Sequence, residues 1–268
     1  MGGLVVLGVV VVGAVFAPWL APHDPTATSF SDVRLTGPSA DHWLGVDRDG
    51  RDILSRLLFG GRASIQVCAL VVVFALLVAL PLGMVAGYLR GPVDAVIMRS
   101  MDALFAFPAL TLALAVAALL GPSLLNASIA IAVVFVPGLV RIVRAQVLAV
   151  REEAFIDASR SVGVGARRML VRHVLPNVAT PLIVQVALSF GYALLAEAGL
   201  SFLGLGVQPP DPSWGTMLQD AYTTITRDSW ALIPPGVAIA VTVLAFNLVG
   251  DGIRDALGRE VFVVKEPR

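Results

Sequence analysis

Residues 141–177 read RIVRAQVLAVREEAFIDASRSVGVGARRMLVRHVLPN, a cationic stretch in a chain that is otherwise strongly apolar. Seven arginines in this stretch face only three acidic residues, Glu152, Glu153 and Asp157, and long hydrophobic runs flank it on both sides. Loops of membrane proteins that carry an excess of Arg and Lys face the cytoplasm. We therefore expect an integral membrane protein in which this stretch is a cytoplasmic loop between two spanning helices.

Composition supports a membrane fold. The 268 residues are 57% hydrophobic and 14% charged, whereas an average soluble domain is about 25% charged. A spanning helix needs roughly 20 predominantly apolar residues. Runs of about this length predict an all-α integral membrane protein with about six transmembrane helices, at Gly2–Leu20, Ser64–Leu89, Ala103–Leu120, Leu125–Val140, Val178–Gly199 and Trp230–Val249.

Charge asymmetry indicates how the chain is oriented. With six spans, both termini lie on the same side of the membrane as the arginine-rich loop. The segments then left outside hold six arginines but nine aspartates, so the positive-inside rule predicts cytoplasmic N- and C-termini in a bacterial plasma membrane. The first run lacks a basic region before it, so we expect an uncleaved anchor, preceded in the whole protein by further cytoplasmic residues.

Several loops also carry structural signals. Residues 23–61 are too polar to span, and within them Leu44–Leu58 changes from a turn to an amphipathic helix, which we expect at the outer interface with Asp47 or Asp49 as its N-cap. Residues 90–102 predict a short cytoplasmic helix. The aromatic residues of the last outer loop are typical of an interfacial belt: Phe202, Trp214, Tyr222 and Trp230.

Signatures of catalysis and metal binding are absent from the sequence. Lys265 is the only lysine, so the Gly-Lys-Ser/Thr motif of a phosphate-binding loop cannot occur. The three histidines, His23, His42 and His173, match no metal-ligand spacing, and we expect each to be a solvated or interfacial side chain. Cys68 is the only cysteine, which excludes an intrachain disulfide. We expect no enzymatic activity, no bound metal and no cofactor in this chain.

The arginine-rich loop combines a small-residue helix with a glycine hinge. Ala158 and its small neighbours permit close approach of another backbone, and Gly163 and Gly165 favour a sharp turn. A second helix is expected over residues 166–174, with Pro176 at the entry to the next span. Such an element can pass the movement of a partner into the spans. The pattern alone equally fits a surface helix pair in which the arginines only enforce orientation.

A family resemblance favours the first interpretation. Asp157-Ala158-Ser159, Gly163 and Leu175-Pro176 fall in the register of the EAA loop of ABC importer permeases. Asp replaces the family's Glu, Ser replaces its second Ala, and His173 stands at an apolar position. Three further blocks, at residues 42–56, 197–206 and 247–257, resemble the second permease subunit of dipeptide and oligopeptide importers.

This resemblance implies a type I ABC importer permease fold with a cytoplasmic coupling helix. It implies as partners a second homologous permease, two ATPase subunits that bind ATP and Mg, and an extracytoplasmic solute-binding protein, with membrane lipid around them and no nucleic acid. The implied organisation is an N-terminal helix and outer segment (1–60), a permease domain (61–252) and a cytoplasmic tail (253–268). The implied ATPase-coupling residues are Glu153, Ala154, Asp157, Ala158, Ser159, Arg160, Ser161 and Gly163.

Other candidate residues lie outside the loop. For an outer gate or a contact with the binding protein we select Asp47, Arg51, Asp52, Glu197, Phe202 and Trp214; polar positions within spans are Gln185, Asn247 and Asp251. Glu197 could instead lie at the interface and cap the following loop, and Gln185 could serve an interhelical hydrogen bond. The expected function is import of short peptides. The alternatives are a same-family importer of nickel, haem or another solute, an ion-driven secondary transporter, or a non-transporting membrane scaffold.

Overall fold

The computed structural model describes residues 2–28 and 35–263, apart from the side chains of Arg160, Thr180 and residues 257–263. The predicted cytoplasmic Met1 and the tail residue Lys265 lie outside this description. The helices are α1 (Gly2–Val15), α2 (Ala17–Leu20), α3 (Ile53–Leu89), α4 (Gly91–Phe105), α5 (Ala109–Leu120), α6 (Leu124–Arg151), α7 (Ala154–Ser161), α8 (Ala166–Met169), α9 (Leu175–Phe202), α10 (Trp214–Tyr222) and α11 (Ile233–Val263). A π-helical turn, η2 (Leu170–Val174), precedes α9, and a 3₁₀ turn, η3 (Trp230–Leu232), precedes α11.

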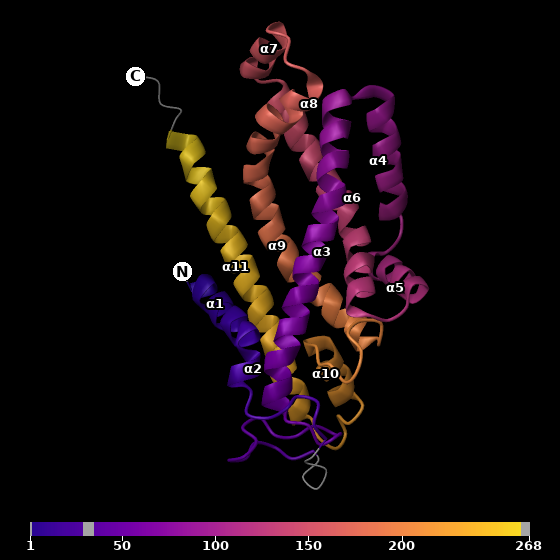
Figure 1. Ribbon diagram of the computed structural model, residues 1–268, viewed down its shortest axis with the longest axis vertical. Coiled ribbons are helices and arrows are strands. Elements are labelled where there is room, and N and C mark those ends of the chain that lie inside the picture. Colours follow the sequence, from indigo (N-terminus) through magenta and orange to yellow (C-terminus); the bar gives the residue numbers. More distant parts are fainter. Residues whose placement is uncertain (1, 29–34, 264–268) are drawn as a thin grey trace.

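The long helices α3, α6, α9 and α11 run along one elongated bundle (Figure 1). The short helices α7 and α8 lie at one end of this bundle, and α10 lies at the other end with the segment that joins α2 to α3. The C-terminal part of α11 points toward the end that carries α7. We call the α7 end the coupling end and the α10 end the loop end.

The predicted membrane spans are largely recovered. Within the described residues, four helical segments are long and apolar enough to cross a membrane: Ile53–Leu89, Leu124–Arg151, Pro181–Phe202 and Trp230–Ala256. Helices α4 and α5 meet the same criteria only when they are counted together, as one broken fifth span. The first predicted span is a shorter apolar helix, Gly2–Val15, followed by α2. Helix α6 extends beyond the predicted end at Val140, to Arg151.

Helix α3 differs from the prediction at its start. Ile53–Leu58 forms no separate interfacial helix but the first turns of a helix of 37 residues. Its N-cap is Asp52, whose side chain accepts a hydrogen bond from the Ser55 amide, and not Asp47 or Asp49. The boundary drawn after residue 60 and that after residue 252 both fall inside helices, α3 and α11. Ile53 is buried in a hydrophobic core cluster and Leu57 packs against it, so these first turns of α3 belong to the core of the fold.

The third predicted span, Ala103–Leu120, is not one straight helix. Residues 91–105 form α4, so the short helix predicted over residues 90–102 is present and continues for three more residues. Helices α4 and α5 meet at a bend of 92° around Phe107 and Pro108. Proline disfavours the α conformation of the residue that precedes it, here Phe107. Proline also lacks the N–H that a continuing helix needs. The sequence therefore breaks the span at this point.

Two hydrophobic clusters fill the bundle, one toward each end. The loop-end cluster includes Ile131, Leu194 and Trp214, and the coupling-end cluster includes Val143, Ile156 and Met169. Large apolar side chains such as Leu77, Leu119 and Leu244 stay exposed on the outside of the helices. This pattern is expected of helices in lipid, where backbone groups are satisfied within each helix and apolar side chains face outward.

Candidate functional site

Helix α7 is a short, exposed helix at the coupling end of the bundle (Figure 1). Of the predicted coupling residues, Ser159 is half-buried, and six are exposed: Glu153, Ala154, Asp157, Ala158, Ser161 and Gly163. The Arg160 side chain lies outside the described residues. Ile156, on the opposite face, is completely buried in the coupling-end cluster. The helix therefore presents mainly small and polar side chains outward, together with the exposed Phe155, while Ile156 is buried against the bundle.

Gly163 ends α7 in a left-handed conformation, with φ of +80°. The Val164 amide donates to the Ser159 carbonyl at 3.1 Å, the bond that closes a Schellman-type helix end. Space around Gly163 is open, since nothing lies within 4 Å of an added Cβ. Glycine is required here by backbone conformation and not by packing.

The chain then enters α9 without a break, through α8 and the π-helical turn η2. Met169 and Val174, on this connection, are completely buried in the same cluster as Ile156. The prediction of a helix, a hinge and a second helix leading into the membrane is confirmed. Buried side chains of one cluster thus link α7 to the start of α9 across the turn at Gly163.

The arginines of this region have more acidic partners than the sequence indicated. Arg144 binds Asp94 through two hydrogen bonds of 2.5 and 2.6 Å, and Arg141 donates to Asp102 at 2.6 Å. Both aspartates belong to α4, so these pairs fix α4 to α6. Arg167, Arg168 and Arg172 are exposed and line an open hollow beside α8. The coupling end therefore keeps a positively charged outer surface.

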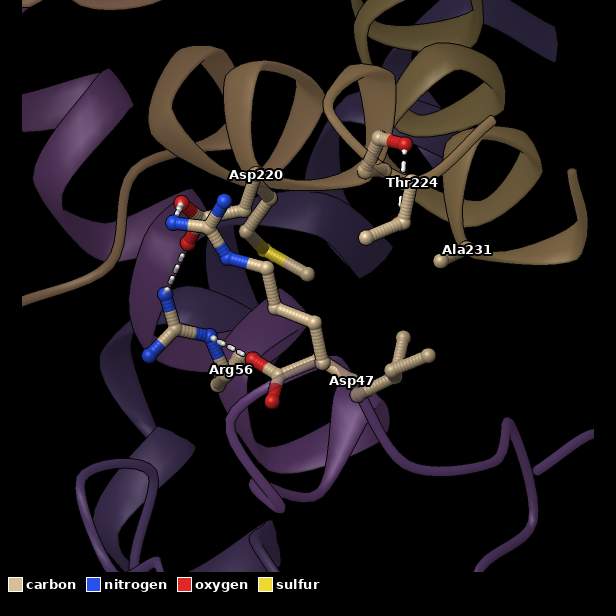
Figure 2. A pocket seen from close by; sticks show the side chains of 9 residues that line it. Asp47, Arg56, Asp220, Thr224 and Ala231 are labelled. Carbon is tan, nitrogen blue, oxygen red and sulfur yellow. Dashed lines mark hydrogen bonds and ion pairs between the residues drawn. The ribbon is translucent and has the colours of Figure 1, made fainter. Parts of the chain in front are cut away.

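At the loop end, a network of charged residues joins the segment before α3 to α10. The Arg56 guanidinium lies between Asp47, at 3.4 Å, and Asp220, also at 3.4 Å (Figure 2). Arg51 donates to the same two carboxylates at 2.8 and 3.0 Å. Arg51 and Arg56 are 7% and 2% exposed. Asp220, on α10, was missed as a site residue because its sequence neighbours carry no related signal.

Two histidines join Asp52 beside this network. His42 is 7% exposed, and its Nδ1 lies 3.0 Å from Asp52 Oδ1, so the expectation of a solvated or interfacial His42 is wrong. His23 Nδ1 lies 3.7 Å from the same oxygen, and the two imidazole rings are 4.8 Å apart. His23 and His42 are 19 positions apart and His42 and Asp52 are 10 apart, spacings that match no metal-binding motif. The fold of the loop between α2 and α3 brings the three side chains together.

Glu197 of α9 is completely buried among hydroxyl groups. Its Oε1 accepts a hydrogen bond from Ser201 Oγ at 2.7 Å, and the Ser64 and Ser213 hydroxyls face the same carboxyl group. Ser64 belongs to α3, and Ser213 caps α10. Glu197 therefore does not lie at an interface; it joins three helices inside the loop end.

The remaining candidates have mixed positions. Trp214 is 3% exposed and donates from Nε1 to the Leu57 carbonyl at 2.9 Å, so it is a core residue and not part of an interfacial belt. Phe202 is half-buried and makes an edge contact with Tyr222. Buried Asp47, Arg51 and Asp52 offer little surface to a docking protein.

The polar span residues separate into three environments. Gln185 lies with Ser189 and Tyr192 along an otherwise apolar groove between α5, α6 and α9. Asn247 is half-buried with Oδ1 close to Gly191 of α9, a position suited to contact between helices. Asp251, one turn later, is exposed.

Comparison with known proteins agrees with this architecture. Residues 79–263 match the family "Binding-protein-dependent transport system inner membrane component", and residues 1–38 match the N-terminal TM domain of oligopeptide transport permease C. The chain is 46% identical to the dipeptide transport system permease protein DppC of Alkalihalophilus pseudofirmus, over 95% of this chain and 84% of that protein. It is 47% identical to the di/tripeptide transport system permease protein DppC of Pseudomonas aeruginosa, over 96% of this chain and 86% of that protein.

A solved structure shares the fold. The inward-facing MetNI methionine ABC transporter matches with a TM-score of 0.64 at 16% identity, over 75% of this chain and 95% of that chain. The predicted all-α, multi-pass membrane fold of a type I importer is therefore confirmed. The chain belongs to the family of binding-protein-dependent transport system inner membrane components, the permease subunits of ABC importers.

Proposed function

We propose that this subunit forms half of the translocation pathway of an ATP-driven importer of short peptides. Family membership supports a transport role, and the printed functions of the most similar relatives support peptides as the solute class. The observation that carries the coupling mechanism is α7, whose polar face is exposed while Ile156 fixes it to the bundle. No covalent chemistry is assigned to any residue of this chain.

Coupling starts at α7. ATPase subunits, which bind ATP and Mg, engage the exposed face formed by Glu153, Ala154, Asp157, Ala158 and Ser161. When these subunits close, they displace α7, and the buried contacts of Ile156 with the α8–η2 segment transmit the displacement to α9. The permease has an inward-facing and an outward-facing state. The ATPases can shift the equilibrium between these states only as far as their affinities for the two states differ.

The proposed orientation follows from charge. The coupling end, with the exposed Arg167, Arg168 and Arg172, faces the cytoplasm, and so do both termini. The loop end faces outward and receives the solute-binding protein. Exposed apolar side chains along the helices contact lipid and the second permease subunit. Nucleic acid has no part in this function.

The solute route is proposed to follow the groove between α5, α6 and α9. This groove offers Gln185, Ser189 and Tyr192 as polar groups on an apolar wall, an arrangement typical of a site that binds varied small ligands. A second permease subunit closes the open side of the groove. Glu197 shapes the outer end indirectly, by holding α9 against α3 and α10.

The decisive experiment is ATP-driven uptake by the complete assembly in proteoliposomes. Ala158→Trp places a bulky side chain on the exposed face of α7, whereas Ala158→Ser is the matched small substitution. We expect Ala158→Trp to release the ATPase subunits during purification and to reduce dipeptide uptake at least about tenfold, because a hot-spot interface loses roughly 1.4 kcal/mol or more. Ala158→Ser should transport normally.

Equal uptake by both variants would reject α7 as the docking helix. Uptake by wild type that persists without any ATPase subunit would support an ion-driven transporter instead. Competition by di- and oligopeptides, Ni²⁺ and haem separates the solute classes. A wild type that takes up Ni²⁺ or haem but no peptide would reject the peptide assignment and keep the coupling mechanism.

A further inference from the structure

The cluster of His23, His42 and Asp52 at the loop end is separate from the coupling helix and from the groove. One nitrogen of each imidazole and one carboxylate oxygen lie within 4.8 Å of one another. We propose that these three side chains bind one divalent transition-metal ion of the zinc class. This site would fasten the segment after α2 to the start of α3.

The distances suit such an ion. Zinc bonds to histidine nitrogen and carboxylate oxygen of about 2.0–2.2 Å in a tetrahedral site separate the donor atoms by about 3.3–3.5 Å. Asp52 Oδ1 lies 3.0 Å from His42 Nδ1 and 3.7 Å from His23 Nδ1, values on either side of that separation. A small rotation of the imidazoles would bring all three donors to bonding distance.

The backbone and the second shell hold the donors in place. Ser55 is the centre of this arrangement: its Oγ donates to Asp52 Oδ2 at 2.8 Å and accepts from the His23 amide at 3.1 Å. The Ser55 amide binds the same Oδ2, so Oδ1 is the oxygen turned toward the imidazoles. The His42 amide donates to Ser39 Oγ at 3.0 Å, which fixes the turn that carries this ring. Ordered outer-shell partners of this kind are typical of metal sites.

Burial and charge also favour a cation. The Asp52 side chain is completely buried and that of His42 is 8% exposed, whereas that of His23 is 27% exposed, which leaves an entry route on one side. A buried carboxylate is destabilising unless a positive group compensates its charge. Two imidazoles and one carboxylate form a donor set that suits zinc and other divalent transition metals.

The neighbouring acidic cluster makes a useful contrast. Asp47, Asp49 and Asp220 also lie within reach of one another. Arg51 lies within 3.0 Å of a carboxylate oxygen of each of these residues. A guanidinium in that position repels a metal ion, so the inference is restricted to the histidine pair.

The test uses the full chain in its transporter assembly, purified without a polyhistidine tag and stripped with a chelator. After incubation with Zn²⁺ and gel filtration, metal content is measured by mass spectrometry. Co²⁺ serves as a second probe, because its visible absorption and X-ray absorption spectra report nitrogen and oxygen ligands. We expect wild type to retain one Zn²⁺ per chain.

His23→Asn is the main variant, because the His23 amide and not its ring makes the hydrogen bond to Ser55. Loss of this ring should weaken Zn²⁺ binding at least about tenfold, since even second-shell changes cost 10–100-fold. His23→Cys, which supplies a thiolate ligand, should restore retention. The matched control is His173→Asn, at the coupling end, which should bind as wild type does.

The metal site is rejected if wild type retains no more Zn²⁺ than His23→Asn, or if Co²⁺ shows no nitrogen ligation. Either result would mean that the imidazoles form only a hydrogen-bonded clasp on Asp52. Peptide uptake is measured separately in the same preparations. A transporter that works and binds no metal would reject this inference and leave the proposed function untouched.

Discussion

At the residue scale, the least expected feature is the burial of two arginines at the loop end. Arg51 and Arg56 share the carboxylates of Asp47 and Asp220, which belong to segments far apart in the sequence. Buried charges are tolerated when each has a partner, and removal of one partner leaves an uncompensated charge. These ion pairs therefore fix the position of α10 against the segment that precedes α3. Apolar contacts are less directional and would not fix that position as closely.

Replacement of Arg56 tests this role. Arg56→Gln should destabilise the protein by about 3–5 kcal/mol, because Asp47 and Asp220 lose a buried counter-charge. Thermal unfolding of the detergent-purified assembly measures the loss. Arg62→Gln removes an exposed arginine from the same helix and should change the melting temperature little. Similar melting temperatures for the two variants would contradict the structural role of Arg56.

The hinge at Gly163 gives a second residue-scale prediction. Gly163→Ala should cost about 1–2 kcal/mol, since L-residues with a Cβ are strained in the left-handed region, and uptake should fall because α7 is redirected. Gly165→Ala is the matched control, since Gly165 has φ of −67° and equally open surroundings. ATP-driven dipeptide uptake at equal protein levels is the measurement. If the two alanine variants transport equally well, the conformation at Gly163 is not needed.

At the element scale, α3 and α6 approach closely along one stripe. An added Cβ on Gly83 would lie 2.6 Å from Val143 Cβ, and one on Gly87 would lie 2.7 Å from Val147 Cβ. Small residues allow helix backbones to pack tightly in membranes, where van der Waals contact drives association. These glycines therefore make the α3–α6 contact a closely packed frame of the bundle.

Gly87→Ala should weaken this frame. The new methyl group also approaches the Arg144 carbonyl oxygen, at 2.9 Å, so the helices must separate at a cost of about 1–3 kcal/mol. Gly138→Ala, on α6, meets nothing within 4 Å and is the control. We expect a lower melting temperature for Gly87→Ala only. Comparable stability of both variants would indicate that α3 and α6 are not in close contact.

At the scale of the whole molecule, the two ends of the bundle must lie on opposite sides of the membrane. Cys68 is the only cysteine and is buried, so a Cys68→Ala background allows single-cysteine labelling. Ala40→Cys, in the exposed outer segment, should react with an impermeant maleimide in intact cells. Val162→Cys, at a position 80% exposed beside α7, should react only after the membrane is opened. The reverse pattern would invert the proposed orientation.

The sequence alone predicted much of this molecule. Apolar runs of about 20 residues predicted the spans. Such a run must hydrogen-bond its own backbone N–H and C=O groups inside a bilayer, and a helix does so within one segment. The small residues of α7, Gly163 and Pro176 predicted a helix, a hinge and a second helix, because these are local backbone preferences. Pro108 could have predicted the bend before α5, since its effect on the helix is also local.

Only the tertiary structure decided which charged groups meet. Asp220 joins Arg56 across 164 positions, and Asp94 joins Arg144 across 50. His23 and His42 meet Asp52 because one loop folds back onto the start of α3. Periodicity and hinge residues act within a few residues of chain, so the sequence determined the helices and the coupling loop. Contacts between distant side chains depend on how the helices pack, so the loop-end network and the histidine cluster required the folded structure.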